Sequence, residues 1–325
     1  MGMLVNGRWQ VEDAYPRDAA GAFVRPASAF RNWITPDGAA GPSGRAGFKA
    51  EAGRYHLYVA GVCPWAHRAR IVRALKGLDG IVGLSIASSI RTDDGWSFDA
   101  RHRDDLFGHR HVHELYTRAD PAYTGRATVP VLWDKATGTI VSNESAEIVR
   151  MFNAAFDPLT GSRLDLYPAA FRSEIDAVNE RVYKGLNNGV YRAGNAKSQA
   201  AYEEAAREVF ATLDWLEARL ATRRYLVGPA PTEADWRLFP SLMRFDLAYH
   251  GVMKCNLRRL ADTPALSAYA RDLYQTPGIA ETVDFDAIKR GYWTNRERNP
   301  SGIVPVGPTV DFTGPHGRER LKEAA

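Results

Sequence analysis

The chain has 325 residues, of which 45% are hydrophobic and 25% charged, a composition typical of a globular protein with about two domains. Its 42 basic and 38 acidic residues are interleaved without a long run of either sign, which argues against a nucleic-acid interface. With only two cysteines, no apolar run near the ~20 residues that span a bilayer and no signal-peptide pattern, we expect a cytoplasmic protein without a membrane partner.

Residues 1–53 carry scattered prolines and little apolar periodicity, so we expect an N-terminal extension packed on the core. The following region, 54–156, alternates between the patterns of strands and helices. Its predicted elements are a strand at 54–60, a helix from Pro64 to about 76, a strand at 81–90, a polar insertion at 91–124, strands at 129–134 and 139–142, and a closing helix. A β-α-β unit followed by a β-β-α unit predicts a thioredoxin-like sheet.

No strand pattern appears after residue 157, and we expect an all-helical domain over 157–292 and an irregular tail over 293–325. Apolar residues recur at spacings of three and four between Ala206 and Leu220, which predicts one buried helix face. Thr232 and Asp235 have the spacing of a capping box at a helix start. The fold class is therefore an α/β thioredoxin-like domain followed by an all-α domain.

Cys63 stands at the predicted strand-to-helix turn in the segment GVCPWAHR. The N-terminus of a helix stabilises a thiolate and lowers the pKa of a cysteine there, and Pro64 suits the first helical position. A resolving cysteine would stand at Ala66, so Cys63 is predicted to form a mixed disulfide with an external thiol, of which glutathione is the abundant cytoplasmic one. The alternative is a small buried residue, which is our expectation for Cys255.

Three further motifs have a structural and a functional interpretation. Val129-Pro130 is a candidate cis-proline next to the thiol helix, or a trans-proline that opens a strand. In the segment SNES, Ser142 or Asn143 is predicted to cap a helix whose first turn carries Glu144 and Ser145; that turn suits the carboxylate and the ammonium of a γ-glutamyl group. The insertion also contains a cluster of histidines, for which a polar surface is favoured over a metal site: His102, His109, His111 and His113.

These segments, together with DGWSF, NNGVYRAG, FDLAYHGVMKCNLRRL and NPSGIVPVGP, resemble the glutathione transferases, and more closely their xi class, the glutathionyl-hydroquinone reductases. The resemblance covers about residues 3–308. A CPxA motif is shared with the omega class, whereas the insertion with DGW, the KCN segment and the tail motif are together specific to the xi class.

The resemblance implies roles for individual residues. The catalytic residues would be Cys63, Tyr191 and Tyr292. Glutathione would be held by Trp96, Arg126, Val129, Pro130, Glu144 and Ser145. The substrate pocket would include Pro64, Trp65, Tyr249, His250 and Trp293. This chain departs from the family pattern at Gly291 and Trp293, which flank Tyr292, and at 251–253. The resemblance therefore does not determine how polar the substrate pocket is.

The implied reaction is glutathione-dependent reduction of glutathionyl-hydroquinones through a Cys63–glutathione mixed disulfide, with release of glutathione disulfide. Glutathione would be a cosubstrate, no cofactor would be bound permanently, and the protein would be a homodimer with thiol transferase activity on the side. Two alternatives stay open. A conjugating glutathione transferase usually has Tyr or Ser at the head of this helix, and in a non-catalytic interaction module Cys63 would be dispensable.

Overall fold

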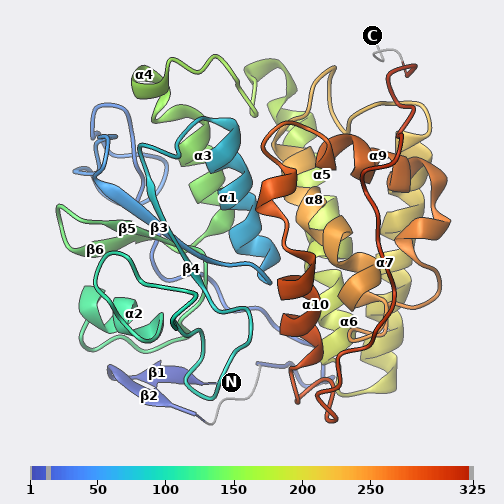
Figure 1. Cartoon of the computed structure of the whole chain (residues 1–325), viewed down its shortest axis with the longest axis horizontal. Coiled ribbons are helices and arrows are strands. Elements are labelled where there is room, and N and C mark those ends of the chain that lie inside the picture. The colour runs from blue at the N-terminus through green and yellow to red at the C-terminus, as the bar shows by residue number, and fades with distance from the viewer. Residues whose placement is uncertain (1, 12–15, 322–325) are drawn as a thin grey trace. The chain divides into compact units, whose positions relative to one another are not determined.

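The structure is a computed structural model that describes residues 2–11 and 16–321 (Figure 1). The chain divides into two compact units, one comprising residues 1–14 and 27–165 and the other residues 15–26 and 166–325. The predicted four-segment division stays a prediction. The two compact units have other limits than those segments. Residues 15–26 group with the helical unit, and the first unit ends at Asp165.

The first unit is built on a four-stranded sheet of order β4-β3-β5-β6. Its strands are β3 (Tyr55–Ala60), β4 (Gly83–Ala87), β5 (Val131–Asp134) and β6 (Thr139–Ser142). β3 pairs parallel with β4 and antiparallel with β5, and every residue of β3 is buried. This confirms the thioredoxin-like β-α-β and β-β-α pattern.

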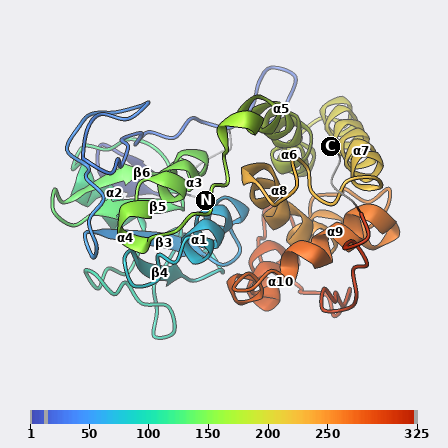
Figure 2. The same cartoon turned by 90° about the horizontal axis from the view of Figure 1, so that it is seen from above.

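Helices α1 (Pro64–Leu75) and α3 (Ser145–Ala154) lie side by side and pack against each other (Figures 1 and 2). The unit also contains α2 (His113–Ala119), α4 (Asp157–Thr160) and a hairpin of β1 (Met3–Val5) and β2 (Arg8–Gln10). No element was predicted within the polar insertion, but it contains α2. This seven-residue helix buries only Leu115 and Tyr116, which is too little for an apolar period to be visible in the sequence.

The second unit is helical. Its longer elements are α5 (Arg172–Val182), α6 (Gly189–Asn195), α7 (Gln199–Leu220), α8 (Glu233–Arg244), α9 (Pro264–Tyr274) and α10 (Phe285–Trp293). The short turns are η1 (Ala169–Phe171), η4 (Leu260–Asp262) and η5 (Ala280–Thr282), and two π-helical turns are η2 (Tyr183–Asn187) and η3 (Phe245–Tyr249). The predicted apolar face of α7 is buried, and the Asp235 carboxylate accepts from the Thr232 N–H at 2.7 Å, as the capping box predicted.

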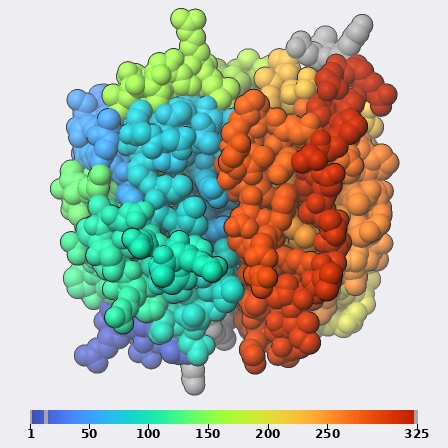
Figure 3. Space-filling view, in the orientation of Figure 1, coloured from blue at the N-terminus to red at the C-terminus, as the bar shows by residue number. Residues whose placement is uncertain are grey.

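The C-terminal tail lies along the surface of the helical unit (Figure 3). Phe312 packs on Tyr274 and Phe285 with ring centroids 5.7 and 5.8 Å away. The buried guanidinium of Arg318 donates to the carbonyls of Leu220 and Ala265. Within the described part of the chain, no helix has the length and apolar character needed to cross a membrane.

Candidate active site

Cys63 lies where β3 gives way to α1 and is the N-cap residue of that helix. Its backbone is extended, with φ −78° and ψ 117°, and Pro64 opens the helix as predicted. The side chain is 9% exposed, and its Sγ donates to the backbone carbonyl of Val129 at 3.4 Å. The thiol therefore stands at the positive end of the α1 dipole, next to the loop that enters β5.

The Val129-Pro130 peptide bond is cis, which confirms the interpretation favoured from the sequence. Tyr116 of α2 holds the backbone of Thr128, the residue before Val129. The Tyr116 hydroxyl donates to the Thr128 carbonyl at 2.8 Å and accepts from the Thr128 N–H at 3.1 Å. Sequence reasoning missed Tyr116, since α2 itself was missed. Burial raises the pKa of this phenol, so it stays protonated as a donor.

Helix α3 is capped by Glu144, and the prediction of a Ser142 or Asn143 cap was wrong. Ser142 still belongs to β6, and its Oγ accepts from the Glu144 N–H at 3.1 Å. The Asn143 side chain accepts from the Phe30 N–H instead. One Glu144 oxygen accepts from the Ala146 N–H at 3.1 Å, and the other accepts from the Ser28 hydroxyl at 2.9 Å. Ser145 follows as the first, buried residue of the helix.

The other predicted residues of this unit lie around the thiol loop and in the insertion. Trp65 is half-buried on α1, with the Arg68 guanidinium 4.6 Å from its ring centroid. Trp96 is half-buried, its carbonyl accepts from the Val112 N–H, and the Arg91 guanidinium lies 4.9 Å from its ring centroid. Arg126 is half-buried three residues before Val129.

The histidines of the insertion bond and stack within the first unit. His109 Nδ1 lies 2.7 Å from a carboxylate oxygen of the buried Asp104, and His102 pairs with Asp99. The His111 and His113 rings stack 5.1 Å apart, and Trp9 of β2 stacks on His113. Among residues 2–11 and 16–321, no group of three or more such side chains is arranged to hold a metal ion.

In the second unit, three tyrosine hydroxyls form a hydrogen-bonded series. The hydroxyls of Tyr191 and Tyr292 are 2.6 Å apart, and those of Tyr292 and Tyr249 are 3.4 Å apart. Burial raises the pKa of Tyr292 and of Tyr249 well above the ordinary value for a phenol. Tyr249 is fully buried, whereas Tyr191 is half-buried. The phenols of Tyr249 and Tyr292 therefore remain protonated near neutral pH and are suited to donate to an oxygen.

Residues from distant segments surround this tyrosine cluster. The Arg25 guanidinium lies 5.0 Å from the Tyr191 ring centroid, and its Nε donates to Asn188 Oδ1 at 2.7 Å. Sequence reasoning missed Arg25, because only the fold places residues 15–26 in the helical unit. His250 follows the π-turn η3 and is half-buried. The Trp293 indole N–H donates to the Leu247 carbonyl at 2.8 Å.

The two family models that match are the N-terminal domain of glutathione S-transferases, over residues 62–155, and the C-terminal domain, over residues 199–272. The chain is 49% identical to the glutathionyl-hydroquinone reductase YqjG of Escherichia coli, over 98% of this chain and 99% of the relative. It is 46% identical to the glutathionyl-hydroquinone reductase PcpF of Sphingobium chlorophenolicum, over 97% and 98% of the two chains.

Solved structures agree with these relatives. The glutathione-bound structure of the Escherichia coli protein superposes with a TM-score of 0.91, covering 98% of this chain and 99% of that chain at 47% identity. The xi-class transferase of Natrialba magadii superposes with a TM-score of 0.90 at 44% identity, covering 99% and 97%. The fold is thus a glutathione transferase N-terminal thioredoxin-like domain followed by the helical C-terminal domain. The chain belongs to the glutathionyl-hydroquinone reductases, the xi class of the glutathione transferases.

Proposed function

We propose that this protein reduces glutathionyl-hydroquinones to hydroquinones with glutathione as the reductant and Cys63 as the nucleophile. The observation that carries the proposal is the position of the Cys63 thiol, at the N-terminus of α1 and 3.4 Å from the Val129 carbonyl. Ala66 stands where a resolving cysteine would be. Cys255 is fully buried, and burial raises the pKa of its thiol to about 12. The sulfur that Cys63 attacks therefore comes with the substrate.

The cradle for the glutathionyl group is proposed to lie in the first unit. The Val129 backbone is suited to pair with the backbone of the glutathione cysteine. At the N-terminus of α3, Ser145 and the first N–H groups are suited to hold the γ-glutamyl carboxylate. Glu144 already accepts from Ala146 and Ser28, but a carboxylate has about four lone-pair sites and retains capacity for the γ-glutamyl ammonium. Trp96 and Arg126 are proposed to contact the rest of the tripeptide.

The chemistry begins with the keto tautomer of the substrate ring, in which the carbon–sulfur bond lies next to a carbonyl. The Cys63 thiolate attacks the glutathionyl sulfur, so that a sulfur–sulfur bond forms and the carbon–sulfur bond breaks. The bonding electrons pass to the ring, which leaves as an enolate and becomes hydroquinone on protonation. A second glutathione thiolate then attacks the mixed disulfide, releasing glutathione disulfide and restoring the Cys63 thiolate.

Tyr191 and Tyr292 are proposed to serve the ring oxygens. A phenol whose pKa lies above 10 donates a hydrogen bond to a developing enolate oxygen at neutral pH, and such donors stabilise a transition state in which charge gathers on oxygen. Tyr249 is fully buried and its hydroxyl lies 3.4 Å from that of Tyr292, so we propose that it supports the pair at the back of the substrate pocket.

The same thiol is proposed to reduce glutathione mixed disulfides as a side activity, since that reaction needs the Cys63 cycle alone. Glutathione is proposed to be a cosubstrate, with no permanently bound cofactor. Cys63 and Cys255 form no disulfide, which agrees with a reducing compartment, and we propose a cytoplasmic location. We also propose a homodimer, as the family resemblance implies.

The test is a turnover assay with a glutathionyl-hydroquinone and glutathione, in which hydroquinone and glutathione disulfide are both quantified. The expected result is equal formation of the two products by the wild type and by Cys255→Ala, and none above background by Cys63→Ser. A wild type without turnover, or a Cys63→Ser variant with full turnover, would overturn the proposal.

A further inference from the structure

Trp293 joins the end of α10 to the π-turn η3. Its indole N–H donates to the Leu247 carbonyl at 2.8 Å. Leu247 lies within the last turn of η3, where helix ends leave carbonyls without intrahelical partners, so the indole satisfies one of them. The Trp293 carbonyl in turn accepts from the Asn299 side chain at 2.7 Å, which ties the tail motif to the same point.

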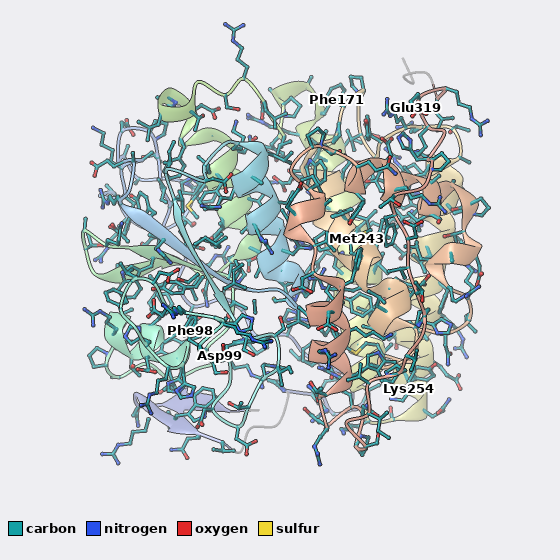
Figure 4. The ribbon with its side chains drawn as sticks, in the orientation of Figure 1. Phe98, Asp99, Phe171, Met243, Lys254 and Glu319 are labelled. Carbon is teal, nitrogen blue, oxygen red and sulfur yellow. The ribbon has the colours of Figure 1, made fainter. Side chains whose placement is uncertain are left out.

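Gly251, in the turn after η3, lies directly against the indole. A Cβ at this position would stand 2.6 Å from Cζ2 and 2.7 Å from Cη2 of Trp293. Gly251 does not have a positive φ, so space and not backbone conformation demands glycine here. Lys254, labelled in Figure 4, marks the end of this turn. Because the indole is held at Nε1, its outer edge cannot swing away without losing the bond to Leu247.

The elements joined in this way carry two of the three clustered phenols. Tyr292 immediately precedes Trp293 on α10, and Tyr249 is the last residue of η3. Their rings meet edge to face, with centroids 5.5 Å apart and planes at 89°. The position of the Tyr292 hydroxyl relative to Tyr249 and Tyr191 thus depends on how the end of α10 sits on η3. The indole bond to Leu247, the close approach of Gly251 to the indole and the packing of the two tyrosine rings all act on that contact.

We propose that Trp293 and Gly251 form a matched pair that positions Tyr292, so that Trp293 is a positioning residue and not a contact for the substrate. The inference rests on the function proposed above. It joins two places where the chain departs from the family pattern, because the bulky ring at 293 requires the absence of a side chain at 251. Cleavage of the carbon–sulfur bond, which needs the Tyr292 hydroxyl, depends on the pair. Thiol–disulfide exchange at Cys63 does not.

The test compares two reactions in each variant: reduction of a glutathionyl-hydroquinone, and reduction of the mixed disulfide of glutathione and 2-mercaptoethanol. For Gly251→Ala we expect the hydroquinone kcat to fall roughly ten- to a hundredfold, the loss that a misplacement of about 1 Å causes. Trp293→Phe removes only the N–H donor and part of the ring, so its hydroquinone kcat should fall less. The KM for glutathione and the disulfide reaction should stay within about twofold of the wild type in both.

Coupling is measured with a double-mutant cycle of Gly251→Ala and Trp293→Ala. Once the indole is gone the added methyl has no neighbour to displace, so the double variant should match Trp293→Ala in hydroquinone kcat. Gly314→Ala is the matched control in the same unit, since a Cβ there has nothing within 4 Å and φ is not positive. It should leave both reactions unchanged.

Three results would overturn the proposal: an unchanged hydroquinone kcat in Gly251→Ala, additive losses in the double variant, or equal losses of both reactions in Trp293→Phe. The last would mean that the tryptophan supports the fold in general. A wild type that reduces the mixed disulfide but not the glutathionyl-hydroquinone would instead refute the proposed function, so the two failures are distinguishable.

Discussion

The thiol of Cys63 donates to the backbone carbonyl of Val129 at 3.4 Å, across 66 residues of sequence. A hydrogen bond of this kind favours the protonated sulfur, whereas the N-terminus of α1 favours the thiolate. A glutathionyl group that pairs with the Val129 backbone would compete for the same carbonyl. If glutathione pairs with Val129 as proposed, substrate binding would release the thiol from its acceptor.

The two cysteines should differ sharply in reactivity. Iodoacetamide at pH 7 should alkylate Cys63 in the native protein and leave Cys255 unmodified, because Cys255 is fully buried and burial raises the pKa of its thiol to about 12. Peptide mass spectrometry after timed quenching measures both sites. In urea the two should react alike, and a native Cys255 that reacts as fast as Cys63 would contradict the assignment.

The contact between Ser28 and Glu144 should support glutathione binding. Ser28→Ala removes the 2.9 Å bond that holds one Glu144 oxygen, and we expect the KM for glutathione to rise several-fold, with a rise of about tenfold for Glu144→Gln. Ser43→Ala is the matched control, since Ser43 donates to Glu147 one turn along the same helix. An equal rise of KM in Ser43→Ala and Ser28→Ala would show that the effect is not specific to Glu144.

The tyrosines should separate the two reactions of Cys63. Tyr292→Phe and Tyr191→Phe should lower hydroquinone formation about a hundredfold and leave reduction of a glutathione mixed disulfide near the wild-type rate. Tyr249→Phe should cost less, because its hydroxyl lies 3.4 Å from Tyr292 and is fully buried. Since the pKa of Tyr292 is raised well above 10, its ionisation should not limit the rate below pH 10. Parallel loss of both reactions in Tyr292→Phe would count against this role.

His56 should make the protein less stable in mild acid. Burial lowers the pKa of its imidazole from 6.5 to about 4, and its Nε2 lies 2.8 Å from the Ser85 hydroxyl. Between those two pH values the unfolded chain binds a proton that the folded chain does not. The free energy of unfolding should therefore fall as the pH drops from about 6.5 to about 4, by up to roughly 3 kcal/mol from this group.

Urea unfolding of the wild type and of His56→Gln at pH 7, 5.5 and 4.5 measures this contribution. The variant should be less stable at pH 7 and should lose less stability on acidification. Identical pH profiles for the wild type and His56→Gln would contradict the expected effect.

Features that depend on a local sequence pattern could be predicted from the sequence. The placement of Cys63 before Pro64, the cis bond at Val129-Pro130 and the buried face of α7 follow from spacing and fold placement, and the structure agrees. Each of these depends on neighbours within a turn or on the order of strands and helices.

The features that were missed depend on contacts between distant segments. Glu144 is the cap of α3 partly because β6 extends through Ser142, and Ser28 reaches it across 116 residues. Tyr116 acts through Thr128 from a helix too short and polar to be recognised. The pairing of Trp293 with Gly251 was visible only as two departures from a family pattern, since the sequence does not say that an indole edge and a missing Cβ share one space.

The most direct test of Cys63 as the sulfur nucleophile is a single-turnover experiment without free glutathione. One equivalent of a glutathionyl-hydroquinone is mixed with the reduced protein, hydroquinone is quantified, and the protein is analysed by intact and peptide mass spectrometry. The predicted result is release of hydroquinone in step with the addition of one glutathione to Cys63, and its removal by added glutathione. Release of hydroquinone without an adduct, or an adduct on Cys255, would contradict the mechanism.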